Sequence, residues 1–242
     1  MNGLSLKETL KKLPKRPIPK VVIFDRDGVL YDTMQCHHDS WAAIYLKHYQ
    51  VTLNPDEIFL EEGRPNDETI DRVSEKYGIP IPPQAEKEEM VVEKEAIFTT
   101  YDTDHLFSDT ILMLDTVIAT GQVPMIATGG YYEGIKEKLL NELEGRIDLA
   151  HMVTRVDYKK GKPNPEPYLR AMEIAGVEAK EAVVVENAPL GVRSAVEAGA
   201  LVFAINTGVL SDQILYDEGA VWVFDSHQEL IEAWSLIMAQ WK

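Results

Sequence analysis

Two carboxylates stand two residues apart at the end of an apolar run in the stretch VVIFDRDGVLYDT, residues 21–33. In an extended strand, residues i and i+2 face the same side, so Asp25 and Asp27 are expected to project together. Carboxylates this close repel each other, so either a cation neutralises them or one holds a proton. A Mg²⁺ ion with a phosphoryl group meets this need, because one carboxylate can attack phosphorus while the other handles the leaving-group proton. By itself the pattern fits a polar turn with a helix-capping Asp equally well.

Three further chemical features follow other apolar runs or a rigid segment. Thr128 ends the run VPMIAT and precedes two glycines, an arrangement suited to cradling a phosphate. Lys162 precedes two prolines in KKGKPNPEPYL, and a rigidly held ammonium suits a phosphoryl group in transfer. Glu186 and Asn187 end the run AVVVE and offer the oxygen ligands that Mg²⁺ prefers. Each feature alone is explained as well by a turn, a surface lysine or a helix cap, but four of them at strand ends in one sheet make coincidence improbable.

The elements that would position these residues alternate along the chain. Short apolar runs predict buried strands at 20–24, 123–128, 182–186, 200–206 and 220–224. Amphipathic stretches predict helices near 107–119, 131–143, 165–175 and 189–198. The alternation predicts an α/β fold with a doubly wound parallel sheet, which gathers the carboxyl ends of its strands at one edge. The C-terminal ELIEAWSLIMAQW predicts an amphipathic helix on the edge of the sheet.

One region breaks this alternation. Between residues 35 and 103 no strand is evident, and the pattern predicts helices near 35–48, 55–60, 67–76 and 84–99. This is too much chain for one crossover between neighbouring strands. We therefore expect a core formed by residues 1–34 and 104–242, with a helical cap inserted over 35–103.

Composition excludes several classes of partner. The 242 residues carry a net charge of −16, which repels nucleic acid and anionic membrane surfaces. No apolar run approaches the roughly 18–20 residues that span a bilayer. The single cysteine, Cys36, excludes an internal disulfide and a thiolate metal cage, and it fits a reducing compartment. We expect a cytoplasmic monomer that binds neither nucleic acid nor membrane.

The order of these motifs resembles the four signature motifs of the haloacid dehalogenase superfamily, with its Rossmann-like core and small helical cap. The resemblance implies that Asp25 is the nucleophile and a metal ligand, and that Asp27 is the general acid/base with its carbonyl on the metal. It implies phosphate binding by Thr128, Gly129 and Lys162, and a Mg²⁺ site completed by Glu186 and Asn187. The acid at Asp27 points to the phosphotransferase branch rather than to true dehalogenases.

Within that superfamily the chain is similar to β-phosphoglucomutase-like members. His37 and Trp41 stand twelve and sixteen residues after Asp25, as in that group, and Lys94 matches a cap lysine that reaches the substrate. Packing in the core of the cap explains Trp41 more simply than a functional role does, and His37 could be a satisfied helix residue.

Two departures from the mutases matter. Asn187 replaces the usual Asp, and Asn66 stands where the mutases carry a phosphate-gripping arginine. The segment Glu62-Gly63-Arg64 instead resembles a bacterial branch that includes an inorganic pyrophosphatase. This resemblance implies that Glu62 reaches the metal and that Arg64 and Lys94 reach the substrate. Without this resemblance, the residues alone favour a solvated, salt-bridged turn at Glu62 and Arg64.

Three functions follow as expectations. The first is a Mg²⁺-dependent phosphohydrolase that acts through an aspartyl-phosphate on pyrophosphate or a small phosphate monoester. The second is a β-phosphoglucomutase, against which the missing cap arginine counts. The third is a non-catalytic sensor of phosphorylated ligands, against which the intact Asp25, Asp27, Thr128 and Lys162 count.

Overall fold

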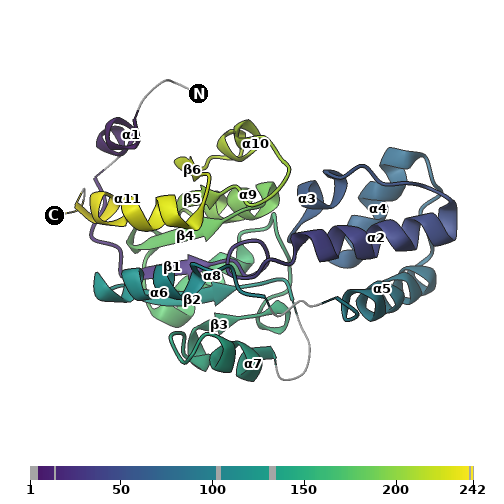
Figure 1. The fold of residues 1–242 in the computed structure, drawn as a ribbon, viewed down its shortest axis with the longest axis horizontal. Coiled ribbons are helices and arrows are strands. Elements are labelled where there is room, and N and C mark those ends of the chain that lie inside the picture. The colour runs from purple at the N-terminus through teal and green to yellow at the C-terminus, as the bar shows by residue number, and fades with distance from the viewer. Residues whose placement is uncertain (1–4, 14, 102–104, 131–134, 240, 242) are drawn as a thin grey trace.

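The fold is built on one parallel sheet. The computed structural model of the chain describes residues 5–13, 15–101, 105–130, 135–239 and 241. In these residues the strands follow the order β3-β2-β1-β4-β5-β6 (Figure 1). The strands are β1 (Val21–Phe24), β2 (Val123–Ala127), β3 (Met152–Val153), β4 (Ala182–Glu186), β5 (Leu201–Ile205) and β6 (Trp222–Phe224). The predicted α/β fold is confirmed.

Helices cover both faces of the sheet (Figure 1). One face packs against α1 (Leu6–Lys12), α6 (Thr110–Ala119), α7 (Ile135–Glu142) and α11 (His227–Ala239). The other packs against α8 (Glu166–Ala175), α9 (Pro189–Glu197) and α10 (Asp212–Asp217). Short 3₁₀ turns span Leu149–His151, Arg155–Asp157 and Ala179–Glu181. Because both faces are covered, the strands are apolar throughout rather than alternating.

Three elements differ from the sequence-based expectation. The two-residue strand β3 and the six-residue helix α10 are too short to leave a periodic signal, and neither was predicted. The C-terminal helix α11 was placed on the edge of the sheet, but it lies on a face beside α6, where Trp234 Nε1 donates to Thr120 Oγ1 at 2.8 Å. Its wide apolar stripe is therefore buried against the sheet core.

The position of β1 locates the crevice of the sheet. β1 pairs with β2 on one side and with β4 on the other, so the chain continues outward in opposite directions from this central strand. Ligands of open α/β sheets bind at such a reversal, outside the carboxyl ends of the strands. The residues that follow β1, β2 and β4 therefore meet at one place.

Four helices form a separate group beside this edge (Figure 1). They are α2 (Met34–Tyr49), α3 (Glu57–Glu61), α4 (Asn66–Tyr77) and α5 (Gln84–Phe98). Their apolar side chains make a core of their own, centred on Trp41, Ile44, Tyr45, Ile70 and Met90. The predicted cap boundaries stay a prediction, and residues 102–104 at the second boundary lie outside the described residues.

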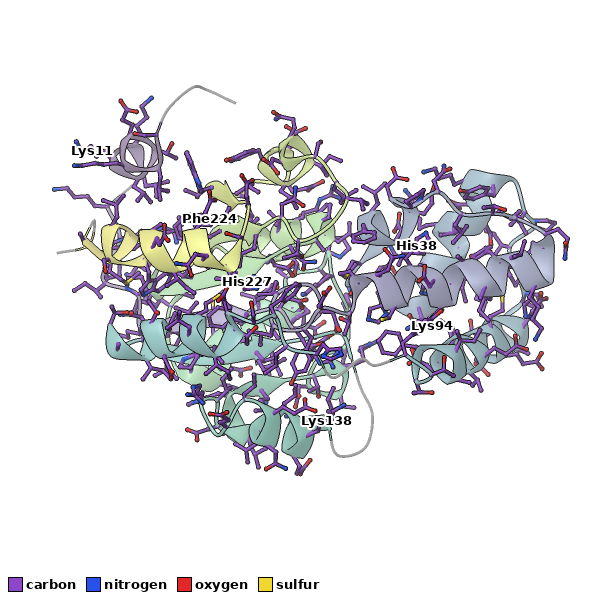
Figure 2. All side chains as sticks on the ribbon, in the orientation of Figure 1. Lys11, His38, Lys94, Lys138, Phe224 and His227 are labelled. Atoms are coloured by element: carbon purple, nitrogen blue, oxygen red, sulfur yellow. The ribbon has the colours of Figure 1, made fainter. Side chains whose placement is uncertain are left out.

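Two connecting segments tie this helical group to the sheet. Asp32 N–H donates to the His105 carbonyl at 2.9 Å, so the outgoing and returning chains pair with each other. His227 lies in the sheet core, whereas Lys94 lies in the helical group (Figure 2). The Nε2 atom of His227 forms a hydrogen bond with the Val29 carbonyl at 2.6 Å. Its ring also packs on Phe107, with centroids 4.6 Å apart. The connection is thus anchored on the core side. Among the described residues, every helix is too short or too polar to cross a lipid bilayer.

Candidate active site

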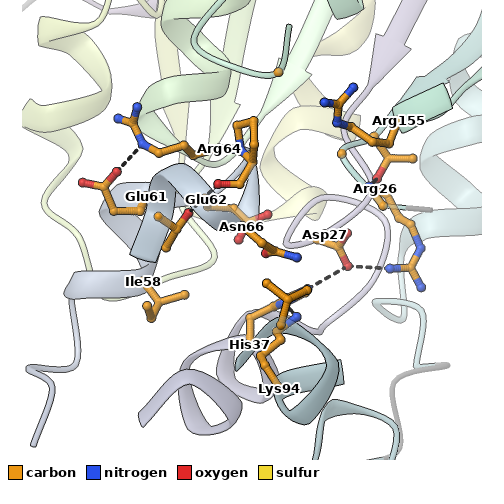
Figure 3. Close-up of a pocket in the computed structure, with 18 of the residues that line it drawn as sticks. Arg26, Asp27, His37, Ile58, Glu61, Glu62, Arg64, Asn66, Lys94 and Arg155 are labelled. Carbon is orange, nitrogen blue, oxygen red and sulfur yellow. Dashed lines mark hydrogen bonds and ion pairs between the residues drawn. The ribbon is translucent and has the colours of Figure 1, made fainter. Parts of the chain in front are cut away.

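A cavity of about 370 Å³ lies between the carboxyl edge of the sheet and the helical group. The sheet side contributes Asp25, Asp27 and Thr128, and the helical side contributes Glu62 and Lys94. Figure 3 shows Asp27 on the sheet side of this cavity with His37 approaching from α2. Most of the side chains that the sequence singled out therefore surround one space.

The centre of the site is a buried ionic network behind Asp25. Lys162 Nζ donates to Asp25 Oδ1 at 2.5 Å and to Glu186 Oε1 at 2.6 Å. All three side chains are at least nine-tenths buried. Burial opposes the charge on Lys162, but attraction to Asp25 and Glu186 outweighs it and raises the pKa of the lysine. Lys162 is thus held as a cation at the carboxyl end of β1.

Glu186 anchors this network. Its Oε1 also accepts the Tyr168 hydroxyl at 2.6 Å, and its Oε2 accepts the backbone N–H groups of Asn187 and Ala188 at 2.9 and 3.0 Å. Both oxygens are therefore occupied by protein donors. In this arrangement Glu186 positions Lys162, and it would reach a metal ion only through water or by exchanging a partner.

We expect Gly191→Ala to disturb this anchor. A Cβ on Gly191 would lie 1.8 Å from Glu186 Oε1, so the carboxylate would have to move. Overpacking of this kind costs about 1–3 kcal/mol, more than the roughly 1 kcal/mol that Ala gains over Gly in a helix. Urea unfolding should show reduced stability, and turnover should fall because Lys162 loses its support. An unchanged unfolding midpoint would mean that Glu186 moves freely.

Asp27 is held by groups from both sides of the cavity. Its Oδ1 accepts Thr33 Oγ1 at 2.6 Å and Arg26 Nη1 at 2.5 Å, and His37 Nε2 lies 3.6 Å away. Burial opposes ionisation, yet Arg26, His37 and Thr33 together hold the pKa of Asp27 below its usual range. Asp27 therefore links the loop after β1 to helix α2 as an ionised group.

The loop after β2 places a hydroxyl at the cavity. Thr128 is buried, and its Oγ1 accepts the Gly130 N–H at 3.0 Å, which leaves the hydroxyl proton to point elsewhere. Tyr158 donates to the Thr128 carbonyl at 3.1 Å and also lines the cavity beside Gly129. The predicted helix start at 131–134 lies outside the described residues. The loop thus has the groups expected of a phosphate cradle.

The helical group contributes two cationic side chains to the lining of the cavity, Lys94 and Arg64, and they point in different directions. Lys94 Nζ contacts His37 Nδ1 at 3.1 Å and sits 4.5 Å from the centroid of the Phe98 ring, inside the site. Arg64 lines the cavity, but its Nε donates to Glu61 at 2.5 Å and its guanidinium turns away from Asp27 (Figure 3). The structure therefore places Lys94 on the helical side of the cavity beside His37 and leaves Arg64 at the rim.

Glu62 faces this cluster from the end of α3. Burial raises its pKa, Asp27 adds to the increase, and His37, Lys94 and Lys162 oppose it. Its neighbour Gly63 has φ of 85° and packs so tightly that an added Cβ would lie 2.7 Å from Lys162 Cδ. The backbone of this turn thus closes directly over the lysine, and it brings Glu62 near the carboxylates of the core.

The residues at the carboxyl end of β1 fit Mg²⁺. Asn187 Oδ1 is buried with no hydrogen-bond partner among the described residues. Its amide packs on the loop that carries Asp25 and Asp27, so tightly that a Cβ on Gly28 would lie 1.9 Å from Asn187 Nδ2. Burial, with repulsion from Glu186 and Asp27, raises the pKa of Asp25 to about 8 against the pull of Lys162. An unpartnered amide oxygen beside crowded carboxylates suits a hard divalent cation with oxygen ligands.

The groups that could bind a metal ion here are of more than one chemical type. Within the described ranges, no three His, Cys, Asp or Glu side chains converge into a cage. Binding would therefore draw on the Asn187 amide and on backbone oxygen as well as on Asp25.

Several residues of the site were missed by the sequence analysis. Tyr168 and Thr33 carry no motif signal, because a hydroxyl on a helix or in a loop is usually solvated or capping. Tyr158 lies in an irregular segment without periodicity. Arg26 lies between the two acids in the sequence, but in a continuing strand its side chain would face the side of the sheet opposite to theirs. Since β1 ends at Phe24, that alternation does not extend to Arg26.

The comparison with known proteins gives the family. A family model for haloacid dehalogenase-like hydrolases matches residues 19–199. This chain belongs to that family. The predicted superfamily membership is confirmed, and the protein is accordingly a hydrolase of the haloacid dehalogenase type.

Proteins similar to this chain are named for several activities. It is 28% identical over 191 residues to validoxylamine A 7'-phosphate phosphatase of Streptomyces hygroscopicus subsp. limoneus, covering 78% of this chain and 86% of that protein. It is 26% identical over 213 residues to "Putative pyrophosphatase PpaX" of Caldanaerobacter subterraneus subsp. tengcongensis, covering 87% and 92%. A solved structure, "Putative beta-phosphoglucomutase from Bacteroides vulgatus", is 34% identical with a TM-score of 0.88 and covers 98% of each chain. The proteins that the chain resembles are thus named as a phosphatase, a "putative pyrophosphatase" and a "putative beta-phosphoglucomutase".

Proposed function

We propose that this protein is a Mg²⁺-dependent phosphohydrolase that works through an aspartyl-phosphate on inorganic pyrophosphate or a small phosphate monoester. The observation that carries the proposal is the buried Lys162, which donates to Asp25 at 2.5 Å, where Asp25 and Thr128 both line the cavity. A nucleophilic carboxylate, a fixed cation and a phosphate-binding hydroxyl are the parts that phosphoryl transfer needs. We also propose that residues 35–103 act as a cap over this core.

The first half of the reaction forms a bond between an Asp25 oxygen and phosphorus. The bond from phosphorus to the leaving oxygen breaks, and its electron pair goes to that oxygen. Lys162 and Thr128 hold the oxygens of the phosphoryl group during transfer. Where the leaving group needs a proton, the protonated form of Asp27 supplies it, and the proton taken from water in the second half of the reaction regenerates that form.

The second half returns the enzyme to its starting state. A water molecule attacks the phosphorus of the aspartyl-phosphate, and Asp27 takes its proton. The acyl phosphate bond breaks, releasing phosphate and the free Asp25 carboxylate. The ionised state of Asp27 in this structure suits it to act as the base in this step.

The proposed ligands of Mg²⁺ are an Asp25 carboxylate oxygen, the Asp27 carbonyl and Asn187 Oδ1, with Glu62 joining from the helical group. A bound Mg²⁺ would supply the positive charge that lets an anionic carboxylate approach an anionic phosphoryl group. Glu186 contributes by fixing Lys162, since its own oxygens are occupied.

A second candidate is a mutase that moves phosphate on a hexose phosphate. The 34% identity to a structure named for β-phosphoglucomutase favours it. A mutase must hold a bisphosphate at both ends, however, and Asn66 stands at the expected arginine position. Arg64 is occupied by Glu61 and by Glu68 at 3.6 Å. These pairings favour hydrolysis.

One panel of substrates separates the alternatives. Purified protein with Mg²⁺ should release phosphate from pyrophosphate or from members of a phosphosugar series. Conversion of β-glucose 1-phosphate to glucose 6-phosphate without phosphate release would favour the mutase. Ligand binding with no turnover of any substrate would overturn both and leave the sensor.

We predict that Glu62 and Asn187 are coupled through the metal. Asn187 offers Mg²⁺ one negative charge less than an Asp would, and Glu62 restores that charge. Glu62→Gln should therefore raise the Mg²⁺ concentration needed for half-maximal activity, and Asn187→Asp should partly rescue that variant. The coupling should be about 0.5–3 kcal/mol in a double-mutant cycle. Mg²⁺ titrations of all four proteins, followed by thermal shift and by activity, test it. Purely additive effects would remove Glu62 from the metal site.

A further inference from the structure

Arg26 is a buried cation inside the cavity. It stands between Asp25 and Asp27, is 5% exposed and lines the same cavity as both acids. β1 ends at Phe24, and the loop turns at Gly28, whose φ is 80°. This turn brings the side chains of three successive residues to one site, where a continuing strand would have sent Arg26 to the opposite face.

An aromatic platform holds the guanidinium in place. Arg26 Cζ lies 4.3 Å from the centroid of the Tyr31 ring. Tyr31 is fully buried, and its hydroxyl donates to Glu142 Oε2 at 2.5 Å. Because Tyr31 covers one face of the planar guanidinium, hydrogen bonding occurs at its edge. That edge reaches Asp27, to which Nη1 donates at 2.5 Å (Figure 3).

The other cations of the cavity are differently placed. Arg64 is paired with Glu61 and turned to the rim, and Arg155 Nη1 donates to the Tyr158 carbonyl at 2.9 Å. Lys94 is on the helical side, against His37. Of the arginines that line the cavity in the described residues, Arg26 is the one bonded to the carboxylate proposed to face the leaving group.

We propose that Arg26 makes this site selective for substrates whose leaving group carries anionic oxygens besides the one that departs, such as the phosphate released from pyrophosphate. This inference rests on the proposed function. When Asp25 bonds to the terminal phosphorus of pyrophosphate, the bond from that phosphorus to the bridging oxygen breaks. The electron pair stays on the bridging oxygen, which leaves as part of a second phosphate.

The position of Arg26 matches that charge. In the proposed reaction Asp27 faces the leaving oxygen, and the Arg26 guanidinium is hydrogen-bonded to Asp27. The guanidinium therefore lies close to where negative charge develops on the departing phosphate. An arginine fork binds phosphate oxygens in a bidentate manner, and a buried pair of this kind is strong. A leaving group without further anionic oxygens gains nothing comparable from Arg26.

Two substrates isolate the charge of the leaving group. Pyrophosphate and p-nitrophenyl phosphate have leaving groups of closely similar basicity, so they make similar demands on protonation by Asp27. The first leaving group carries additional anionic oxygens and the second does not. We would measure kcat/KM for both substrates with the native enzyme, Arg26→Met and Arg26→Lys. Arg146→Met removes an arginine outside the cavity, paired with Asp115, and is the matched control.

The ratio of the two kcat/KM values gives the result. In Arg26→Met the ratio of pyrophosphate to p-nitrophenyl phosphate should fall about 10- to 100-fold, the size of one charge-assisted hydrogen bond. Arg26→Lys should recover part of it, and Arg146→Met should leave it unchanged. A ratio that stays constant would overturn the inference, because Arg26 would then act only through Asp27. If Arg26→Met does not fold, Arg26→Gln, which can still donate to Asp27, takes its place with the same two outcomes. A native enzyme that hydrolyses neither substrate would instead reject the proposed function.

Discussion

Asp25→Asn should give a folded protein with no measurable turnover of any phosphorylated substrate. An amide is a poor nucleophile, and loss of the nucleophile in a covalent mechanism costs about 10⁴-fold or more in kcat. The fold should survive because the amide oxygen can still accept from Lys162, and because the neutral amide adds no charge beside Glu186 and Asp27. The thermal midpoint should therefore move little while phosphate release stops.

A control variant and the trapping of phosphate on the enzyme both test the role of Asp25. Asp32→Asn changes an exposed acid seven residues along the chain and should leave turnover near the native level. Acid quenching of the native enzyme during turnover, followed by peptide mass spectrometry, should find the phosphoryl group on Asp25. Phosphate trapped on any other residue would reject Asp25 as the nucleophile.

Lys162→Met should damage both stability and activity. The substitution leaves Asp25 and Glu186 buried without their shared cation. Removing one member of a buried ionic network typically costs about 3–5 kcal/mol. Turnover should also fall by at least about 10²-fold, because a fixed charge aimed at the transferring group is lost. Urea unfolding and initial rates measure the two effects separately.

The stability loss in Lys162→Met should depend on pH. A carboxyl group whose pKa is raised on folding favours the folded state below its ordinary range and loses that contribution as pH rises through the raised value. The pKa of Asp25 is already about 8 in the native protein because of burial, and losing Lys162 would raise it further. The difference between variant and native protein should therefore change little between pH 5 and pH 7 and grow as pH rises above about 8, the pKa of Asp25 in the native protein. Lys160→Met, which removes an exposed lysine two residues away, should show neither effect.

Much of the site follows from the sequence because parallel strands share an edge. Apolar runs ending in Asp25, Thr128 and Glu186 mark the carboxyl ends of β1, β2 and β4, and neighbouring parallel strands must bring those ends together. The long strand-free region likewise indicated the helical group, since no single crossover needs so much chain. These inferences depend only on local periodicity and on the geometry of sheets.

Other predictions depended on partners that periodicity does not reveal. Substrate binding by Arg64 stays a prediction: Arg64 lines the cavity, but Glu61, three residues before it, pairs with it, so Arg64 would have to exchange that partner to reach a substrate. Glu186 was expected to offer oxygen to a metal, but Tyr168 and Lys162 occupy one oxygen and backbone N–H groups the other. Which of several possible partners a charged side chain takes is decided by packing.

The sequence by itself determined which residues gather at the edge of the sheet, and in what order along the chain. Only the tertiary structure decided what each of them does there. Lys162 meets Asp25 across 137 positions of sequence, and attraction to Asp25 and Glu186, which outweighs the cost of burial, keeps this lysine a fixed cation. Arg26 faces the cavity because β1 stops one residue before Asp25, and Tyr31 and Glu142 then hold its guanidinium in place. Burial and pairing between distant residues set the charge and orientation of these side chains, and the spacing of residues along the chain predicts neither.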